Sequence, residues 1–305
     1  MDVFTLYHRS VETWADRVNA VRPEQWDLPT PCREWSVRDL TNHVTGEDRW
    51  TVPLMRGSTP DEVGGRLDGD LLGDDPIEAS LTAAADATTV VRETVASDKP
   101  VHLSYGDEGR GEYLHQLAAD HLVHGWDLAV ATGSDPRLDP ALVHEVASWF
   151  AAREEMYRSA GVVGAPAVGA VAAGDAQAEL LARFGRDPAW GPNHAALFRL
   201  SEAFGRGDVD AIMATLTDDC VFESTSPPDG EVVVGADAIR AVWTDLFAGA
   251  GARFEEEELV VAGDRGVLAW RYSWTGEDGP GHVRGVDVLR FRDGRVCEKR
   301  SYVKG

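Results

Sequence analysis

Apolar residues recur at helical spacing near the start of the chain. Between Asp2 and about Val21 they fall on one face of a helix, at Val3, Leu6, Tyr7, Val11, Trp14 and Val18. This pattern predicts an amphipathic helix with a polar outer face. A second helix is expected near Val37 to Leu54, because Ser36 is a suitable N-cap and Asp39 gives a capping-box-like start.

Helical patterns continue through the N-terminal half of the chain. After a long loop rich in Gly, Asp and Pro, they are expected at about Ile77–Ser97, Gly111–Ala131, Pro140–Ala160 and Asp175–Phe184. Gly133 suits the left-handed C-cap of the helix that contains His124. The first four helices predict an all-α four-helix bundle, which the last two extend.

The pattern changes after Asn193, where helices give way to strands. Helices are expected at about His194–Gly205, Val209–Leu216 and Ala236–Phe247. Strands are expected at Arg253–Val261, Gly266–Thr275, His282–Phe291 and Val296–Val303, with an Asp-Gly hairpin turn before the last of them. Helices on one side of a curved antiparallel sheet make this half α+β.

Composition sets the domain count and the class of protein. A chain of 305 residues with 43% hydrophobic content is longer than one typical domain. The Gly- and Pro-rich stretch GRDPAWGPN is the best boundary, so we expect domains at residues 1–188 and 194–305 with a linker at 189–193.

Charge, the apolar pattern and the cysteines argue against a nucleic-acid-binding, membrane-bound or disulfide-linked protein. A formal net charge of -23 repels a phosphate backbone, so no nucleic-acid partner is expected. The first residues lack a signal-peptide pattern and no stretch is long and apolar enough to span a membrane, which predicts a cytoplasmic protein with no membrane partner. Cys32, Cys220 and Cys297 are expected to be reduced thiols.

One helix carries a pair of residues that could bind a metal. Asp120 and His124 lie four residues apart, so their side chains share a helix face and can close on one ion. The same spacing also fits a simple ion pair. His115 and His121 lie on this helix too and could compete as ligands, although His121 should point away from the pair.

Three motifs of the N-terminal half carry a family resemblance. PTPCREWSVRDLTNHVTGEDRW, ADHLVHGWDLAVATG and LARFGRDPAW occur in this order. The region from Asp2 to Trp190 resembles the DinB-like, mycothiol-dependent maleylpyruvate isomerase N-terminal family. The resemblance implies that His43, Asp120 and His124 bind a divalent metal, with Asp120 standing where the isomerase has glutamate.

The implied metal set leaves a coordination position open for water or substrate, as in catalytic sites. Zinc is the first expectation, with nickel, iron or manganese as alternatives. In the same motifs Trp126 is expected to pack, Asp127 to be a hydrogen-bonding partner behind the ligands, and Cys32 to be a buried motif residue.

The C-terminal half resembles a second family. RGVDVLRFRDGRVCEKRSYVKG, with LTDDCVFES and VVVGADAIRAVW upstream, resembles SnoaL-like proteins of the nuclear-transport-factor-two fold. That fold implies a cone with a pocket, for which we expect the residues Trp270, Tyr272, Arg284, Arg300 and Tyr302. Asp287 shares a strand face with Leu289 and Phe291, so it is either a catalytic acid or base in that pocket or the partner of an arginine such as Arg300.

Three functions remain open at this point. The first is a metal-dependent enzyme of small-molecule metabolism, an isomerase or transferase that uses mycothiol as a thiol cosubstrate and acts on an electrophilic small molecule. The second is cyclase, isomerase or hydrolase chemistry in the C-terminal pocket with a structural metal in the bundle. The third is a non-catalytic protein that binds a metal or metabolite. A homodimer through the C-terminal sheet is a further expectation.

Overall fold

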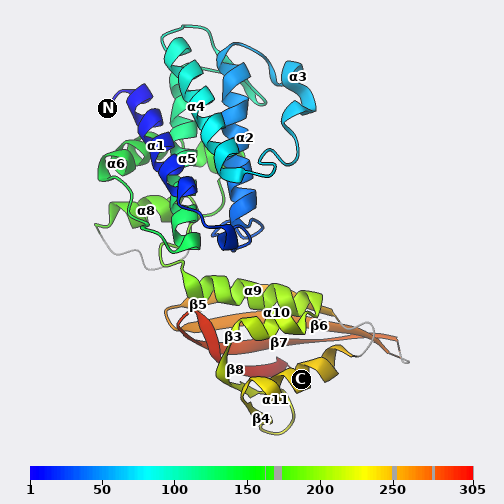
Figure 1. Cartoon of the computed structure of the whole chain (residues 1–305). Helices are drawn as coiled ribbons and strands as arrows, with labels where there is room; N and C mark the ends of the chain where they lie inside the picture. The colour runs from blue at the N-terminus through cyan, green and yellow to red at the C-terminus, as the bar shows by residue number, and fades with distance from the viewer. Residues whose placement is uncertain (162, 168–173, 249–252, 277–278, 305) are drawn as a thin grey trace. The chain divides into compact units, whose positions relative to one another are not determined.

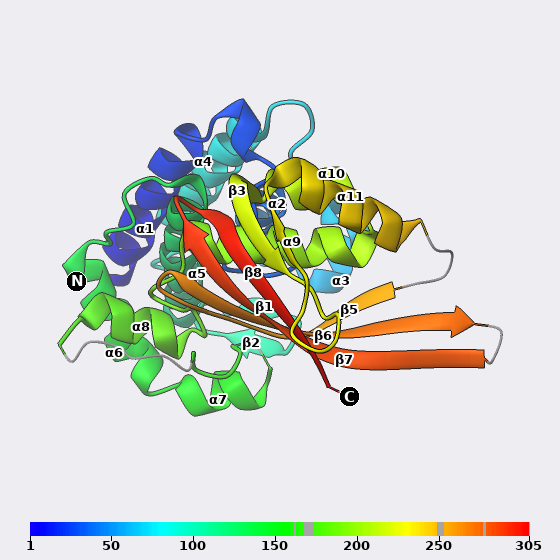
Figure 2. The same ribbon diagram turned by 90° about the horizontal axis from the view of Figure 1, so that it is seen from below.

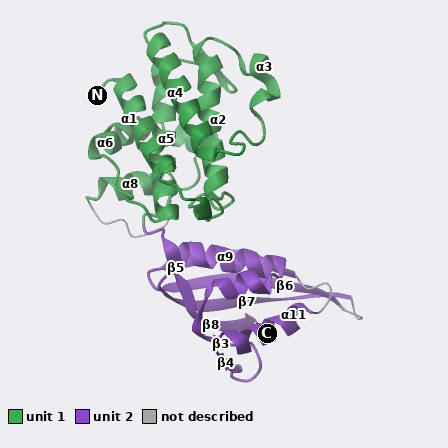
Figure 3. Ribbon diagram, viewed as in Figure 1, with its two compact units in different colours: residues 1–188 green, residues 189–305 purple. Residues whose placement is uncertain are grey.

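The chain divides into two compact units in the computed structural model, which describes residues 1–161, 163–167, 174–248, 253–276 and 279–304. Unit 1 comprises Met1–Pro188 and unit 2 comprises Ala189–Gly305 (Figure 3). Helix α9 (Pro192–Arg206) begins inside the expected linker, so the last two linker residues are helical. Among the described residues, none of the helices combines the length and the apolar character that a membrane span requires.

Unit 1 is built on a four-helix bundle, as expected (Figure 1). Its helices are α1 (Val3–Asn19), α2 (Val37–Met55), α4 (Pro76–Thr94) and α5 (Arg110–Thr132), and α1 packs on α4 and α5 while α2 packs on the same two helices. The Ser36–Asp39 capping box starts α2, and Gly133 ends α5 in the left-handed conformation. The capping box thus sets the start of α2, and the glycine sets the end of α5, and these are the two helices that carry the candidate ligands.

Smaller elements of unit 1 depart from the sequence predictions. The expected helix at Pro140–Ala160 is broken into α6 (Pro140–Ala151) and α7 (Glu154–Ser159), because Arg153 leaves the helical conformation with φ -127° and ψ -9°. The expected loop contains α3 (Pro60–Val63) and a short 3₁₀ helix, Gly64–Leu67. A second short 3₁₀ helix lies outside this loop, at Pro23–Gln25. Strands β1 (Val101–Leu103) and β2 (Gly106–Glu108) form a small hairpin before α5, and α8 (Ala176–Arg183) agrees with the prediction.

Unit 2 is a six-stranded sheet with helices on one face (Figure 2). The strand order is β4-β3-β8-β7-β6-β5, formed by β3 (Leu216–Glu223), β4 (Val232–Val234), β5 (Arg253–Ala262), β6 (Arg265–Gly276), β7 (Gly279–Arg292) and β8 (Arg295–Lys304). The core joins α9, α10 (Val209–Ala214) and α11 (Ala236–Phe247) to the inward residues of the sheet, among them Leu268, Leu289 and Val296. The fold is the expected SnoaL-like cone.

Two features of the sheet differ from the prediction. The sheet is mixed rather than antiparallel, because β3 pairs with β8 in parallel. Leu216 starts β3 instead of ending a helix, since α10 stops at Ala214. The four strands after α11 were predicted correctly, and the Asp293-Gly294 turn has positive φ at both residues, as a tight hairpin requires.

Candidate functional site

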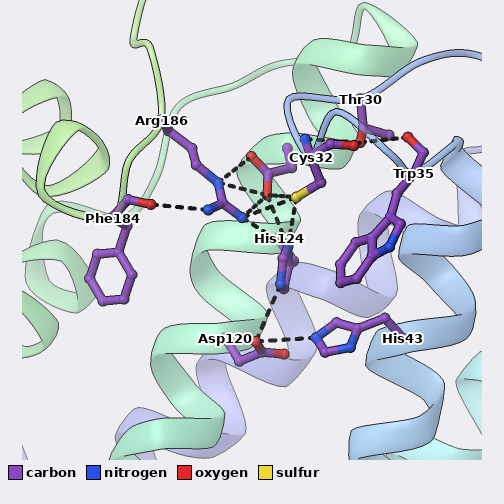
Figure 4. Close-up of polar contacts among 9 residues, drawn as sticks. Thr30, Cys32, Trp35, His43, Asp120, His124, Phe184 and Arg186 are labelled. Atoms are coloured by element: carbon purple, nitrogen blue, oxygen red, sulfur yellow. Dashed lines mark hydrogen bonds and ion pairs between the residues drawn. The ribbon is translucent and has the colours of Figure 1, made fainter. Parts of the chain in front are cut away.

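The structure brings His43, Asp120 and His124 together at one wall of unit 1 (Figure 4). His43 comes from α2, and the other two side chains come from successive turns of α5. The Oδ1 atom of Asp120 lies 3.5 Å from His43 Nε2 and 3.3 Å from His124 Nε2. One ligand atom from each residue lies within 4.8 Å of the other two.

This arrangement fits a divalent metal. Bonds of about 2.0–2.1 Å in a tetrahedral zinc site place ligand atoms roughly 3.3 Å apart. The two histidine–carboxylate distances match this spacing and are too long for strong hydrogen bonds. Asp120 Oδ2 is also buried without a hydrogen-bond partner among the described residues, which leaves its lone pairs available to a bound cation or water.

The electrostatics of the three residues favour positive charge between them. Burial opposes the ionisation of Asp120, but the two histidines outweigh it and hold the pKa of this carboxyl well below its usual range. Burial alone would lower the pKa of His124, yet the carboxylates of Asp120 and Asp127 raise it well above its usual value. The charge of the cluster is therefore suited to a cation, either protons or a metal that replaces them.

A second group of residues supports His124 from behind. Asp127 Oδ2 lies 2.9 Å from His124 Nδ1 and accepts a 2.9 Å bond from Arg186. Arg186 also contacts Cys32 Sγ at 3.1 Å, and this thiol donates to Asp127 at 3.4 Å. Cys32, His124 and Asp127 could converge on a cation by themselves, but the guanidinium of Arg186 already provides one there. Asp127, Arg186 and Cys32 therefore serve to orient the ring of His124 toward Asp120 and His43.

A cavity of about 560 Å³ opens in front of the candidate ligands. Aromatic side chains form much of its lining: Trp35, Tyr113, Trp149, Phe150, Tyr157 and Phe184. The ring of Trp35 lies 4.7 Å from that of His43. Cys32 also lines the cavity and is only partly buried, which differs from the sequence expectation.

Glu47 is a cavity residue that the sequence analysis missed. It lies one helical turn after His43 on α2, a spacing that could have identified it. Burial, with a contribution from the carboxylate of Asp120, raises the pKa of Glu47. Arg186 was also missed, although it lies in the motif LARFGRDPAW. Nothing in the local sequence predicts that this segment contacts Asp127 of α5.

The other histidines of α5 do not belong to the metal group. His115 Nδ1 contacts the carbonyl oxygen of Gly111, and its ring stacks on Trp149. His121 is fully buried and points away from the pair, as expected, with Nε2 3.2 Å from Asp48 Oδ1. Burial opposes protonation of His121, but the carboxylate of Asp48 prevails and raises its pKa to about 9.

Unit 2 contains a separate cavity of about 590 Å³. Trp270 and Tyr272 line it, as the sequence analysis expects, and Trp274 continues the aromatic stripe. Asp287 and Leu268 are buried in the lining, and Val283 is partly buried beside them. The inward orientation of Asp287 agrees with the alternation along β7.

Three expected pocket residues lie elsewhere. Arg284, Arg300 and Tyr302 are absent from the described lining, because alternation along β7 and β8 turns them to the other face of the sheet. Arg284 pairs with Glu257, and Arg300 pairs with Glu298. The partner of Asp287 is therefore not Arg300. It is Lys299, whose Nζ lies 2.9 Å from Asp287 Oδ2.

Comparisons with known proteins assign a family to each unit. Residues 7–129 match the mycothiol maleylpyruvate isomerase N-terminal domain, and residues 197–299 match the SnoaL-like domain. Uncharacterized proteins from two strains of Mycobacterium tuberculosis are 32% identical over 150 residues, which cover 48% of this chain and 75% of each relative.

Solved structures resemble unit 2. An NTF2-like protein of unknown function from Mesorhizobium loti is 37% identical, with a TM-score of 0.34 over 37% of this chain and 92% of that protein. A putative SnoaL-like polyketide cyclase from Jannaschia is 23% identical, with a TM-score of 0.34 over 39% of this chain and 90% of that protein.

Proposed function

The chain belongs to the mycothiol maleylpyruvate isomerase N-terminal domain family through residues 7–129 and to the SnoaL-like family through residues 197–299, and from this premise we propose a metal-dependent enzyme. Its reaction is a thiol-linked isomerisation or transfer on an electrophilic small molecule, with mycothiol as the thiol cosubstrate. The metal, zinc in the first instance, is held by His43, Asp120 and His124.

The convergence of three ligand atoms on the wall of a cavity supports this proposal most directly. Three protein ligands leave a position for an exogenous ligand, which distinguishes catalytic from structural zinc sites. The cavity of about 560 Å³ has room for a small substrate beside that position.

A bound divalent metal would supply a Lewis acid that lowers the pKa of a coordinating thiol, so that the thiolate is available at neutral pH. Residues around the candidate ligands would orient them and shape the cavity for that chemistry. Asp127 fixes the ring of His124 through Nδ1, which leaves Nε2 directed at Asp120. The aromatic lining would reduce the access of water to a bound substrate.

Glu47 and Gln116 are the polar groups of the lining best suited to position a substrate. Glu47 lies on the same wall as His43, while Gln116 comes from α5 and bonds to the hydroxyl of Tyr105. Burial raises the pKa of Glu47, which makes this carboxyl better suited to donate or accept a proton in the cavity.

Turnover by the full chain tests the proposal. Zinc-loaded protein is assayed with mycothiol and maleylpyruvate for isomerisation, and with mycothiol and 1-chloro-2,4-dinitrobenzene for thiol transfer. His43→Ala should abolish turnover, while His144→Ala, on an exposed position of α6, should leave it unchanged. Equal activity of wild type and His43→Ala would refute a role for the metal in the reaction.

A second candidate role is acid–base chemistry by Asp287 in the cavity of unit 2. Its carboxylate accepts bonds from both Lys299 and Ser301, so it is already engaged by the protein. An Asp287→Asn variant that kept full activity on a substrate turned over in unit 2 would exclude this role.

A further inference from the structure

The two histidines of the candidate metal group differ in how their rings are held. His124 has a partner at each ring nitrogen, with Asp120 beside Nε2 and Asp127 beside Nδ1. His43 has Asp120 beside Nε2, but its Nδ1 atom has no hydrogen-bond partner among the described residues. The side chain of His43 is also more exposed, at 29% against 9% for His124. His43 therefore lacks the hydrogen bond that usually fixes the ring of a metal-binding histidine.

An indole ring lies against His43 instead (Figure 4). The centroid of the Trp35 ring is 4.7 Å from that of His43, and the two planes meet at 34°. The same indole lies 5.9 Å from the ring of His124. Aromatic rings stabilise each other at these distances. An imidazole that binds a metal ion carries more positive charge, and the electron-rich face of an indole attracts such a ring. The contact therefore favours the metal-binding form of His43.

The loop before α2 fixes the backbone of Trp35. Thr30 is fully buried, and its hydroxyl donates to the carbonyl oxygen of Trp35 at 2.9 Å and accepts from the backbone N–H of Cys32 at 3.1 Å. The backbone N–H of Trp35 donates to the carbonyl oxygen of Cys32 at 2.8 Å, and a β-bridge joins Pro29 to Ser36. One buried hydroxyl thus ties together the loop that carries the indole.

We propose that Trp35 is a positioning residue of the metal centre, and that its indole holds the ring of His43 in the orientation that binds the ion. This inference rests on the metal centre proposed above and adds a residue outside its ligand set. Thr30 acts one step further away, because it fixes the loop from which the indole projects.

Titration of the full chain with cobalt(II), which takes the place of zinc and absorbs visible light, tests the proposal. The titration gives the affinity, and the spectrum at saturation reports the coordination geometry. Trp35→Leu should bind cobalt about 3- to 10-fold more weakly than wild type, because His43 loses the ring that holds it. Its saturated spectrum should also differ from that of wild type. Trp35→Phe keeps an aromatic face and should recover most of the affinity and the wild-type spectrum.

A second tryptophan provides the matched control. Trp26 packs on the same apolar cluster as Trp35, but the described part of the chain shows no ring contact between it and either histidine. Trp26→Leu should therefore keep the affinity and the spectrum of wild type. Thr30→Val removes only the hydroxyl and should weaken cobalt binding by about 2- to 5-fold. Circular dichroism checks the folding of each variant, and Thr30→Val and Trp35→Phe decide the case if Trp35→Leu does not fold.

The outcomes separate this inference from the metal centre on which it rests. Wild-type affinity and spectrum in Trp35→Leu, or an equal loss in Trp26→Leu, would overturn the positioning role and leave the metal centre standing. A loss in Trp35→Phe as large as that in Trp35→Leu would overturn the role of ring stacking. A wild-type chain that binds no cobalt would overturn the metal centre itself, and this inference with it.

Discussion

At the scale of single residues, the proposed metal centre depends on how His124 is held. Its ring contacts Asp120 through Nε2 and Asp127 through Nδ1, and Arg186 anchors Asp127 through 2.9 Å and 3.2 Å contacts. Partners of this kind fix the tautomer and orientation of a ligating histidine.

Arg186→Met should lower the affinity for zinc by about 10- to 100-fold, because Asp127 loses its anchor and His124 its fixed orientation. Competition with a chromophoric chelator measures this affinity. Arg186→Lys should recover part of it. Arg183→Met removes a guanidinium that pairs with Glu154 at 2.7 Å and is the matched control. Unchanged affinity in Arg186→Met would mean that Arg186 has no positioning role.

The buried pair of Asp48 and His121 makes a different residue-level prediction. Asp48→Leu should reduce the free energy of unfolding by about 3–5 kcal/mol, because His121 stays buried but loses the carboxylate that stabilises its protonated ring. Urea denaturation measures the loss. The double variant Asp48→Leu/His121→Leu should recover part of it, and a double variant as unstable as the single one would contradict the electrostatic explanation.

At the scale of elements, sequence patterns predicted what is local and missed what depends on pairing. The Ser36–Asp39 capping box and the Gly133 C-cap gave the limits of two helices to within a residue or two. The parallel pairing of β3 with β8 joins residues far apart in the chain and has no local signal.

The candidate site residues show the same difference between local signals and contacts that join distant parts of the chain. Helical spacing predicted that Asp120 and His124 share a face, whereas His43 entered only through a family resemblance. One of the two alternatives for Asp287 paired it with an arginine such as Arg300, whereas its partner in the structure is Lys299, because strand register decides the pairing. Asp287 lies opposite Ser301, so Lys299 and Ser301 share its face while Arg300 is turned away.

The Trp270–Gly285 pair supplies a prediction at this scale. Gly285→Ala should destabilise unit 2 by about 1–3 kcal/mol, because the new methyl group overlaps Trp270 and lies 2.6 Å from the carbonyl oxygen of Tyr302. Thermal unfolding followed by tryptophan fluorescence reports the change. Gly111→Ala, whose Cβ would have no atom within 4 Å, should be neutral or slightly stabilising. Equal stability of the two variants would show that β7 adjusts without cost.

At the scale of the whole molecule, each unit has its own cavity and its own polar cluster. The candidate metal ligands all belong to residues 1–188, and the cluster of Lys299, Asp287 and Ser301 belongs to residues 189–305. Effects of substitutions in separate groups of contacts are expected to add.

Zinc content and the thermal stability of unit 2 should therefore respond to different substitutions in the full chain. His43→Ala should lose zinc and keep the unfolding temperature of unit 2, while Gly285→Ala should keep zinc and lower that temperature. Zinc analysis and scanning calorimetry on the same preparations measure both properties. Loss of both properties in either single variant would show that the metal site and unit 2 are coupled.

The central claim is that His43, Asp120 and His124 form a metal centre, and the metal content of the purified full chain tests it most directly. After loading with zinc and removal of excess ion, mass spectrometry of the elements should find about one zinc per wild-type chain. The variants His43→Ala, Asp120→Ala and His124→Ala should each bind zinc at least about 10-fold more weakly, because three ligands share the ion. A wild-type chain that retains no divalent metal, or ligand variants that retain as much as wild type, would contradict the account.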